Sequence, residues 1–334
     1  MTAVRLLVPE GAGDPRRVSG GNVYDLEVRD GLRRRGWTVT VAEAAGAADA
    51  ASAVRGLADG ALLLVDGLVA ARAADELEAV ADRLRVVVLA HMVVAAFADA
   101  TAAEIEAERR ALASARRIVV TSSWTAAELV RRGLADADRI TVAVPGVAPG
   151  PVARHAGDRA LLCVGVVARH KGQDTLLAAL ARLCDRDWGC VLAGSPDASP
   201  AFAARIARRA AAFDGRVRLA GVLDRPALAD AYDRTALLVA PSRVESAGMA
   251  IAEARARGIP VIGTTVGGIP ETVSGGGALL VRPGDPVALA DALHGWMTDA
   301  ALRERLRREA LAVRRLLPRW DATTAAVAGA LEAA

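Results

Sequence analysis

The sequence predicts an α/β protein with two doubly wound, Rossmann-like domains, and three observations support this fold class. Short apolar runs alternate with helical patterns over the whole chain, which is typical of parallel sheets with helices on both faces. The 334 residues are enough for two domains of ordinary size. A segment rich in proline and glycine, residues 145–151, interrupts the alternation and is typical of a hinge. The predicted domains are therefore residues 1–148 and 149–334.

The individual elements follow from the same alternation. In the first domain, helices are expected at residues 23–35, before the stop signal Gly36, and at residues 102–116. The strands expected there are 4–8, 39–42, 61–65, 86–90, 118–121 and 140–144. The strands expected in the second domain are 160–164, 189–193, 217–219, 236–239, 261–264 and 279–281. A helical tail begins near residue 286, and its last helix is free to pack back on the first domain.

Composition excludes several classes of protein. The chain has 42 Lys+Arg and 39 Asp+Glu, and aromatic residues make up only 3%, so nucleic acid is not expected as a partner. No apolar run approaches the roughly 20 residues of a membrane span, and the N-terminal apolar stretch is too short for a secretion signal. Cys163, Cys184 and Cys190 lack CxxC spacing and lie in or beside apolar runs. We interpret them as buried thiols and predict a cytoplasmic protein without a transmembrane segment.

Ligands of open parallel sheets bind at the carboxyl ends of the strands, and three groups of residues follow predicted strands. The first is Ser19-Gly20-Gly21-Asn22, which opens the helix beginning near residue 23. Glycines at a helix N-terminus let free backbone N–H groups approach a phosphate closely. The alternative is a glycine turn that only caps the helix.

The second group is Arg169-His170-Lys171-Gly172, directly after the strand 160–164. Lys171 is the single lysine of the chain, and the other 41 basic residues are arginine. Two cations two residues apart could bind a diphosphate and stabilise it as it leaves. The alternative is a solvated basic turn.

The third group, Pro241 to Ala254, follows the strand 236–239 and is the most specific of the three. Glu245 precedes a helix that Gly248 opens, and Glu253 lies in the second turn of that helix. Both carboxylates are placed to accept hydrogen bonds from hydroxyl groups. The alternative, two surface glutamates, is less favoured because the neighbouring residues are apolar.

With these motifs in place, residues 161–285 resemble the nucleotide-sugar-dependent retaining glycosyltransferases of the GT-B fold. The resemblance is to the large group, similar to glycosyltransferase family 4, that is marked by a glutamate, seven residues and a second glutamate. Here these are Glu245 and Glu253. The other matching residues are 165–172, 242–253, 258–262, 267–271, Gly20-Gly21-Asn22 and the strand-ending His91.

The resemblance implies two domains that face each other across a cleft, with the acceptor on the first domain and the donor on the second. It implies that Glu253 binds the ribose, that Glu245 contacts the sugar, and that His91 lies near the anomeric centre. Ala247 stands where the family commonly has an aromatic residue. The catalytic residues expected are His91, Arg169, Lys171 and Glu245, and the donor-binding residues are Gly20, Gly21, Arg169, Lys171, Val222, Leu223, Glu245, Gly248, Met249 and Glu253.

The expected function is retaining transfer of a sugar from a UDP or GDP sugar to a hydroxyl-bearing, small-molecule acceptor. No cofactor or metal is expected, because Asp185-Arg186-Asp187 lies between a helix and a strand and is interpreted as a surface turn. The alternatives are a nucleotide-sugar epimerase of the same fold and a catalytically silent nucleotide-sugar-binding homologue. A dehydrogenase is not favoured, since the Gly20-Gly21 loop lacks the G-x-G-x-x-G fingerprint. A homodimer is considered beside a monomer.

Overall fold

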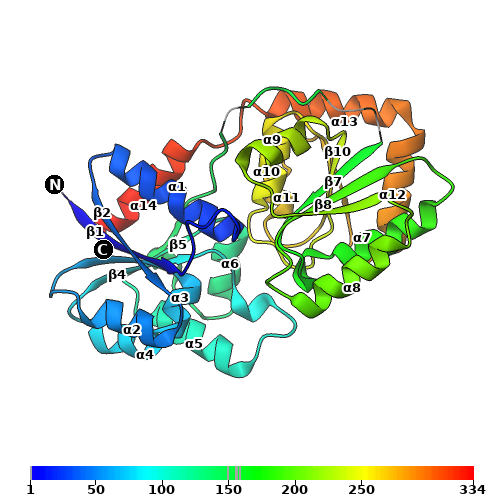
Figure 1. The fold of residues 1–334 in the computed structure, drawn as a ribbon. Coiled ribbons are helices and arrows are strands. Elements are labelled where there is room, and N and C mark those ends of the chain that lie inside the picture. The colour runs from blue at the N-terminus through cyan, green and yellow to red at the C-terminus, as the bar shows by residue number, and fades with distance from the viewer. Residues whose placement is uncertain (1, 149, 155–156, 158) are drawn as a thin grey trace. The chain divides into compact units, whose positions relative to one another are not determined.

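The computed structural model describes residues 2–148, 150–154, 157 and 159–334, which form two compact units (Figure 1). The first unit comprises the residues up to Asp14, Gly20–Gly146 and Pro318–Ala334. The second unit comprises Pro15–Ser19 and Val147–Leu317. The last seventeen residues thus belong to the first unit by their contacts, although the sequence-based division groups them with residues 149–334.

The first unit contains a six-stranded sheet with the order β2-β1-β3-β4-β5-β6, in which all pairs are parallel. From β1, the chain adds β2 on one side and then β3 and the later strands on the other side, so the order of strands reverses between the neighbours β1 and β3. Every strand predicted for this unit is present. The strands are β1 (Ala3–Pro9), β2 (Thr38–Ala44), β3 (Leu62–Asp66), β4 (Arg85–Ala90), β5 (Arg117–Val120) and β6 (Ile140–Val142).

Helices cover both faces of this sheet, with α1 and α14 on one face and α2, α4 and α5 on the other (Figure 1). The helix predicted at residues 23–35 begins earlier, at Gly20, because both glycines accept helical backbone angles and join its first turn. Helix α5 ends at Ala113 rather than at residue 116. The elements are α1 (Gly20–Arg34), α2 (Ala47–Arg55), α3 (Gly67–Arg72), α4 (Ala74–Val80), η1 (Val94–Ala96), α5 (Ala102–Ala113), α6 (Ser123–Arg131), η2 (Ala137–Arg139) and α14 (Trp320–Glu332).

The C-terminal helix α14 is an integral part of the first unit. The ring of Trp320 packs edge-on against Tyr24 of α1, with 5.6 Å between ring centroids. The Thr323 hydroxyl donates a hydrogen bond to the carbonyl of Val144 at 2.7 Å. Gly31 of α1 lies so close to α14 that a Cβ there would come within 2.2 Å of the Thr324 hydroxyl. Helices α1 and α14 therefore pack without room for another side chain.

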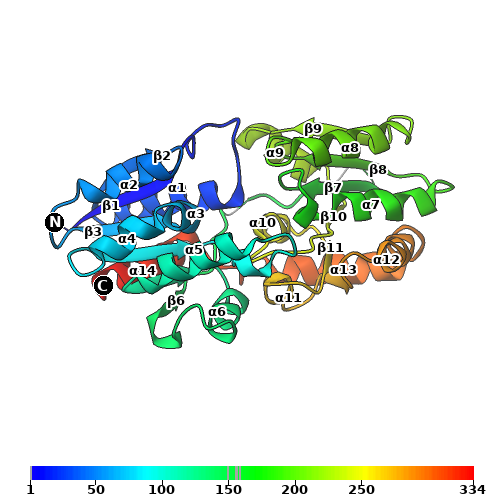
Figure 2. The same ribbon diagram turned by 90° about the horizontal axis from the view of Figure 1, so that it is seen from below.

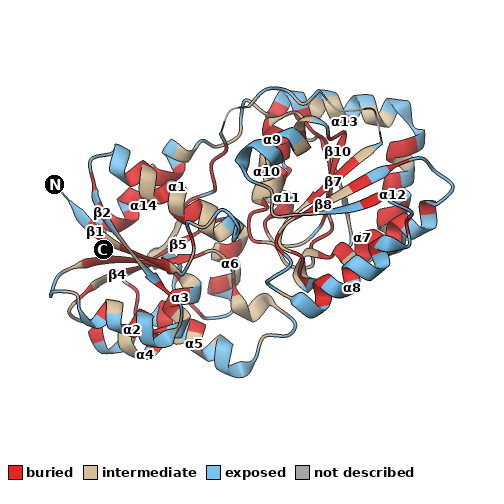
Figure 3. Ribbon diagram, in the orientation of Figure 1, coloured by how far each residue is buried: buried red, intermediate tan, exposed pale blue. Residues whose placement is uncertain are grey.

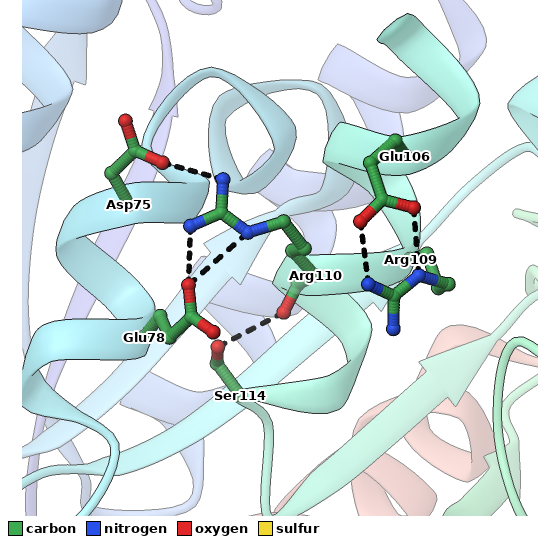
Figure 4. Close-up of polar contacts among 6 residues, drawn as sticks. All are labelled: Asp75, Glu78, Glu106, Arg109, Arg110 and Ser114. Carbon is green, nitrogen blue, oxygen red and sulfur yellow. Dashed lines mark hydrogen bonds and ion pairs between the residues drawn. The ribbon is translucent and has the colours of Figure 1, made fainter. Parts of the chain in front are cut away.

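Helices α4 and α5 are joined at the surface by Arg110, which contacts the carboxylates of Asp75 and Glu78 (Figure 4). Arg109 pairs with Glu106 inside α5, and the Ser114 hydroxyl donates to the carbonyl of Arg110. Exposed ion pairs of this kind add little stability. The packing of the two helices depends mainly on buried apolar residues such as Leu77, Ala111 and Leu112.

The second unit contains a second parallel sheet, with the order β12-β11-β10-β7-β8-β9. Figure 2 shows β9, β8, β7, β10 and β11 following one another across this unit. The direction of growth reverses between β7 and β10. All strands predicted here are present: β7 (Ala160–Val164), β8 (Gly189–Ala193), β9 (Val217–Gly221), β10 (Leu237–Ala240), β11 (Val261–Thr264) and β12 (Ala278–Val281).

The helices of the second unit connect its parallel strands, as right-handed crossovers require. They are η3 (Arg169–Lys171), α7 (Gln173–Leu180), η4 (Ala181–Leu183), α8 (Pro200–Ala211), α9 (Arg225–Asp233), α10 (Met249–Ala256), α11 (Ile269–Thr272), α12 (Pro286–Thr298) and α13 (Ala300–Val313). Figure 3 shows the buried residues concentrated in the strands and in the helix faces that cover them. Among the described helices, none is both long enough and apolar enough to cross a membrane.

The prediction of three buried thiols is wrong for one cysteine. Cys163 on β7 and Cys190 on β8 are buried, but Cys184 is exposed. Cys184 follows η4, where Leu180 and Leu183 are buried in the core. Ala181, Arg182 and Cys184 lie on the opposite, exposed side of this turn. Closeness to an apolar run in sequence therefore does not place a residue on the apolar face of a helix.

Candidate active site

The loops after β7 and β10 meet at the point where the second sheet reverses its direction of growth. Ligands of open α/β sheets bind at such switch points. Gly172 has a φ of 71°, and a Cβ there would lie 2.0 Å from the carbonyl oxygen of Pro241. Only glycine fits this backbone and this approach. The turn that carries Arg169 and Lys171 is thus packed directly on the loop that carries Glu245.

Arg243 ties the two loops together, a role that the sequence did not indicate. Its backbone N–H donates to the carbonyl of His170 at 2.7 Å, and its guanidinium donates to the carbonyl of Arg169 at 2.8 Å. The same guanidinium forms two hydrogen bonds with the carboxylate of Asp174, at 2.7 and 3.1 Å. Paired geometry of this kind fixes both partners in direction. Arg243 therefore holds the Arg169–Lys171 turn in place.

Lys171 and Glu245, which the sequence placed in one site, form an ion pair with 2.7 Å between Nζ and Oε2. Their side chains are only 21% and 13% exposed, and the Ser242 hydroxyl donates to the same carboxylate oxygen at 3.2 Å. Burial alone would raise the pKa of Glu245, but the charge and hydrogen bond of Lys171 bring it below its ordinary value. Glu245 is therefore a carboxylate whose charge is held by Lys171. Arg169 lies in the same turn with an exposed side chain.

Helix α10 positions Glu253 on the same side of the sheet, after β10. Gly248 precedes the helix with a φ of 67°, and Met249 is its first residue. The hydroxyl of buried Tyr232, on α9, donates a hydrogen bond to the carbonyl of Ala250 at 3.2 Å and lies beside the Glu253 carboxylate. Burial raises the pKa of Glu253, and Tyr232 and the charges of Arg257 and Arg225 oppose the increase only in part. Glu253 is thus a half-buried carboxyl group with a raised pKa, unlike Glu245 with its paired cation.

The remaining predicted donor residues lie in loops of the same unit. Val222 and Leu223 follow β9 and are partly buried, and Leu223 packs against the apolar cluster that contains Ile251. The carbonyl of Ala247 accepts a hydrogen bond from the Thr272 hydroxyl. Asp185 and Asp187 are exposed between η4 and β8, at the amino end of that strand. The interpretation of these two aspartates as a surface turn is confirmed.

In the first unit, the predicted residues Gly21 and His91 lie against each other. His91 directly follows β4, and a Cβ built on Gly21 would lie 3.4 Å from the Cδ2 atom of the imidazole. Gly20 and Gly21 form the first turn of α1, whose N–H groups have no partner within the helix. His91 is therefore placed beside the amino end of a fifteen-residue helix.

Two buried aspartates that the sequence did not indicate hold His91. The imidazole Nε2 lies 2.8 Å from Oδ1 of Asp25 and 3.4 Å from Oδ2 of Asp66. Burial would lower the pKa of His91, but the two carboxylates raise it to about 9. Burial raises the pKa of Asp25 to about 6, although the charge of His91 opposes this.

Asp66 could have been found from the sequence, because it ends an apolar strand at its carboxyl edge. It also caps α3 by accepting from the N–H groups of Leu68 and Val69. Asp25 lies within a predicted helix, where its sequence context does not distinguish it from a charged residue on the exposed face. Among the described residues, Asp25, Asp66 and His91 are the one set of three or more His, Cys, Asp or Glu side chains whose possible ligand atoms all lie within 4.8 Å of one another. In this structure the Nε2 atom of His91 is already engaged in a hydrogen bond with the Asp25 carboxylate.

Comparison with known proteins finds glycosyltransferases similar to this chain. Residues 158–299 match the family model described as "Glycosyl transferases group 1". The chain is 32% identical over 257 residues to a D-inositol 3-phosphate glycosyltransferase of Streptomyces avermitilis, over 70% of this chain and 55% of that protein. It is 34% identical over 143 residues to the lipopolysaccharide core biosynthesis mannosyltransferase LpsB of Rhizobium meliloti, over 41% of each chain. The chain spans about half the length of the relatives named as D-inositol 3-phosphate glycosyltransferases.

Solved structures share the whole fold. Sucrose-phosphate synthase from Thermosynechococcus elongatus has a TM-score of 0.81 at 22% identity and covers 98% of both chains. Alr3699/HepE from Anabaena, solved in complex with UDP and glucose, has a TM-score of 0.77 at 17% identity and covers 100% of both chains. The fold is therefore GT-B, and residues 158–299 match the glycosyl transferases of group 1.

Proposed function

We propose that this protein is a retaining glycosyltransferase that moves a sugar from a nucleoside diphosphate sugar to a hydroxyl group of a small acceptor. The observation that carries the proposal is the Lys171–Glu245 ion pair at the switch point of the second sheet, with Glu253 on the following helix. A cation, a carboxylate and a second carboxylate at one sheet edge suit the diphosphate, the sugar and the ribose of such a donor.

In this proposal the second unit binds the donor. Lys171 and Arg169 neutralise the diphosphate, Glu253 accepts hydrogen bonds from the ribose hydroxyls, and Val222 and Leu223 flank the base. The departing phosphate takes the proton of the acceptor hydroxyl on the face from which it leaves, so the anomeric configuration is kept. UDP is the first nucleotide to test, since a neighbour in fold was solved with UDP and glucose.

The acceptor belongs to the first unit in this proposal. Several relatives are named as D-inositol 3-phosphate glycosyltransferases, which supports a polyhydroxylated acceptor with a phosphate group. The charge of His91 and the amino end of α1 favour an anionic ligand in this unit. We therefore choose inositol 3-phosphate as the first acceptor to test. No cofactor or divalent cation takes part in the proposed reaction, and activity is expected to survive EDTA.

The test is a transfer assay with UDP-glucose, UDP-N-acetylglucosamine or GDP-mannose, with and without inositol 3-phosphate. Mass spectrometry should detect a glycosylated acceptor, and proton NMR of fresh product should show the anomeric configuration of the donor. Lys171→Met should lower turnover by about 100- to 1,000-fold, the cost of removing one group that stabilises the leaving charge. Arg182→Ala, a change of an exposed cation on η4, is the control and should leave turnover unchanged.

Other outcomes would replace the proposal with an alternative. An epimer formed from the nucleotide sugar alone would indicate an epimerase. Binding of nucleotide sugars without any turnover would indicate a silent homologue. An inverted product, or activity lost with EDTA and restored by Mn²⁺, would contradict the proposed chemistry.

A further inference from the structure

The group Asp25, Asp66 and His91 lies at the switch point of the first sheet, outside the donor residues described above. Asp66 ends β3, His91 follows β4, and Asp25 lies in the second turn of α1, which follows β1. Strands β1 and β3 are the neighbours between which this sheet reverses. Three elements thus bring their side chains to the edge where an α/β sheet binds ligands.

Burial separates the roles of the three side chains. The Asp25 and Asp66 side chains are 0% and 3% exposed, whereas that of His91 is 13% exposed. A ligand can reach the imidazole but not the carboxylates. The aspartates can therefore act on a ligand only through His91.

The two buried carboxylates of the group favour a cation between them. A buried carboxylate without a compensating partner is costly. Oδ2 of Asp25 has no hydrogen-bond partner among the described residues, and Oδ1 of Asp25 is paired with His91. Asp66 accepts from two backbone N–H donors of α3, which carry no formal charge. His91 faces both carboxylates, and in its charged form it pairs with them and carries a second N–H on Nδ1.

We propose that Asp25 and Asp66 are positioning residues, which hold the His91 imidazole in one orientation and in its charged form so that it can donate to the sugar during transfer. This proposal rests on the proposed function and on the role that the family resemblance implies for His91, near the anomeric centre. It adds the two residues that set the direction and the charge of the ring. Both carboxylates face Nε2, and the ring packs against Gly21 and the ring of Tyr24, both on α1.

The titration of His91 agrees with this geometry. The two carboxylates raise its pKa to about 9 against the effect of burial, so the ring is charged at neutral pH. The groups that face it are Asp25 and Tyr24 from α1 and Asp66 from β3. The Tyr24 hydroxyl donates to the carbonyl of Ala143, and burial keeps the pKa of Tyr24 far above neutrality, so Tyr24 does not titrate with His91.

The experiment follows His91 directly by NMR in the full chain, with its imidazole signals identified by their loss in His91→Gln. Asp25→Asn and Asp66→Asn keep the shape of each side chain and remove its charge. Each change should lower the pKa of His91 from about 9 toward its ordinary value. Glu128→Gln is the matched control, since Glu128 is a poorly exposed carboxylate of the same unit that pairs with Arg131 and Arg132. It should leave the His91 titration unchanged.

The same variants are then assayed for sugar transfer between pH 6 and pH 9. We expect kcat of Asp25→Asn to fall by about 10- to 100-fold at pH 8, the scale for partners that orient a ligating histidine. At pH 6 the ring is charged again, so kcat should recover most of this loss, while KM for the donor changes little. A purely structural role would not produce recovery at low pH. Asp66→Asn supplies the test if Asp25→Asn does not fold.

Two results would overturn the inference. One is an unchanged His91 titration in both variants, and the other is a lowered pKa with a pH profile of transfer like that of the wild type. A wild-type chain that transfers no sugar would instead contradict the proposed function. The NMR titration would then still decide whether the two aspartates hold the charge of His91.

Discussion

Glu245 and Glu253 are both carboxylates of one motif, but their surroundings give them different chemistry. The charge of Glu245 is held by Lys171, and its pKa is lowered. Burial raises the pKa of Glu253 more than the neighbouring Tyr232, Arg257 and Arg225 lower it. Glu253 is therefore suited to accept hydrogen bonds from neutral hydroxyl groups. In the proposed reaction, the donor phosphate competes with Glu245 for the ammonium group of Lys171.

This difference predicts opposite effects of two matched substitutions on the binding of UDP. Glu245→Gln removes the competing carboxylate and frees Lys171, so UDP should bind more tightly by about fivefold, which corresponds to ~1 kcal/mol for one screened ion pair. Glu253→Gln replaces a charged acceptor and should weaken UDP by about tenfold or more. Calorimetry with UDP measures both, with the exposed Glu304→Gln as control. Equal losses in the two variants would refute the division of roles.

The residues that the sequence indicated are those whose signal is local. Lys171 stood alone among arginines, and the spacing of Glu245 and Glu253 is a property of one segment. Arg243, Tyr232 and Asp25 gave no such signal, because their importance depends on partners far away in the chain. Asp174 lies 69 residues from Arg243, and His91 lies 66 residues from Asp25. Apolar periodicity does not reveal which charges meet.

At the scale of elements, the strands could be predicted because a strand buried on both faces is a continuous apolar run. β3 is such a strand, since every residue from Leu62 to Asp66 is buried. The order of the strands could not be predicted, because an apolar run indicates that a strand is buried but not which strands lie beside it in the sheet. The two sheets in fact differ in order, with reversals between β1 and β3 and between β7 and β10. These reversals, rather than the strands themselves, locate the two candidate sites.

Two glycines in the paired helices α1 and α14 predict opposite changes in stability. Gly31 of α1 faces Thr324, so Gly31→Ala should lower the free energy of unfolding by about 1–3 kcal/mol through overpacking. Gly329 lies inside α14, and a Cβ placed there would meet nothing within 4 Å, so Gly329→Ala should raise it by about 0.5–1 kcal/mol. Urea unfolding followed by circular dichroism is the measurement. A neutral Gly31→Ala would mean that the two helices do not pack as closely as described.

At the scale of the whole molecule, the chain completes the second unit and then returns to the first. Trp320, Val327 and Leu331 of α14 supply apolar surface to the first unit, and two of these, Val327 and Leu331, are fully buried. The apolar pattern near the C-terminus predicted a helix but did not show which unit it joins. A helix is amphipathic toward any apolar partner, so its pattern alone does not identify that partner.

Removal of Pro318–Ala334 should therefore weaken the first unit and spare the second. Without α14, Tyr24 loses the ring of Trp320, Val144 loses the hydrogen bond from Thr323, and the face of α1 around Gly31 becomes exposed. Hydrogen exchange followed by mass spectrometry should show faster exchange in peptides of α1, β5 and β6, which contact α14. Peptides of α7 and β8 in the second unit serve as the internal control and should exchange as in the full chain. Faster exchange in those peptides as well, or full protection of α1, would show that α14 does not belong to the first unit alone.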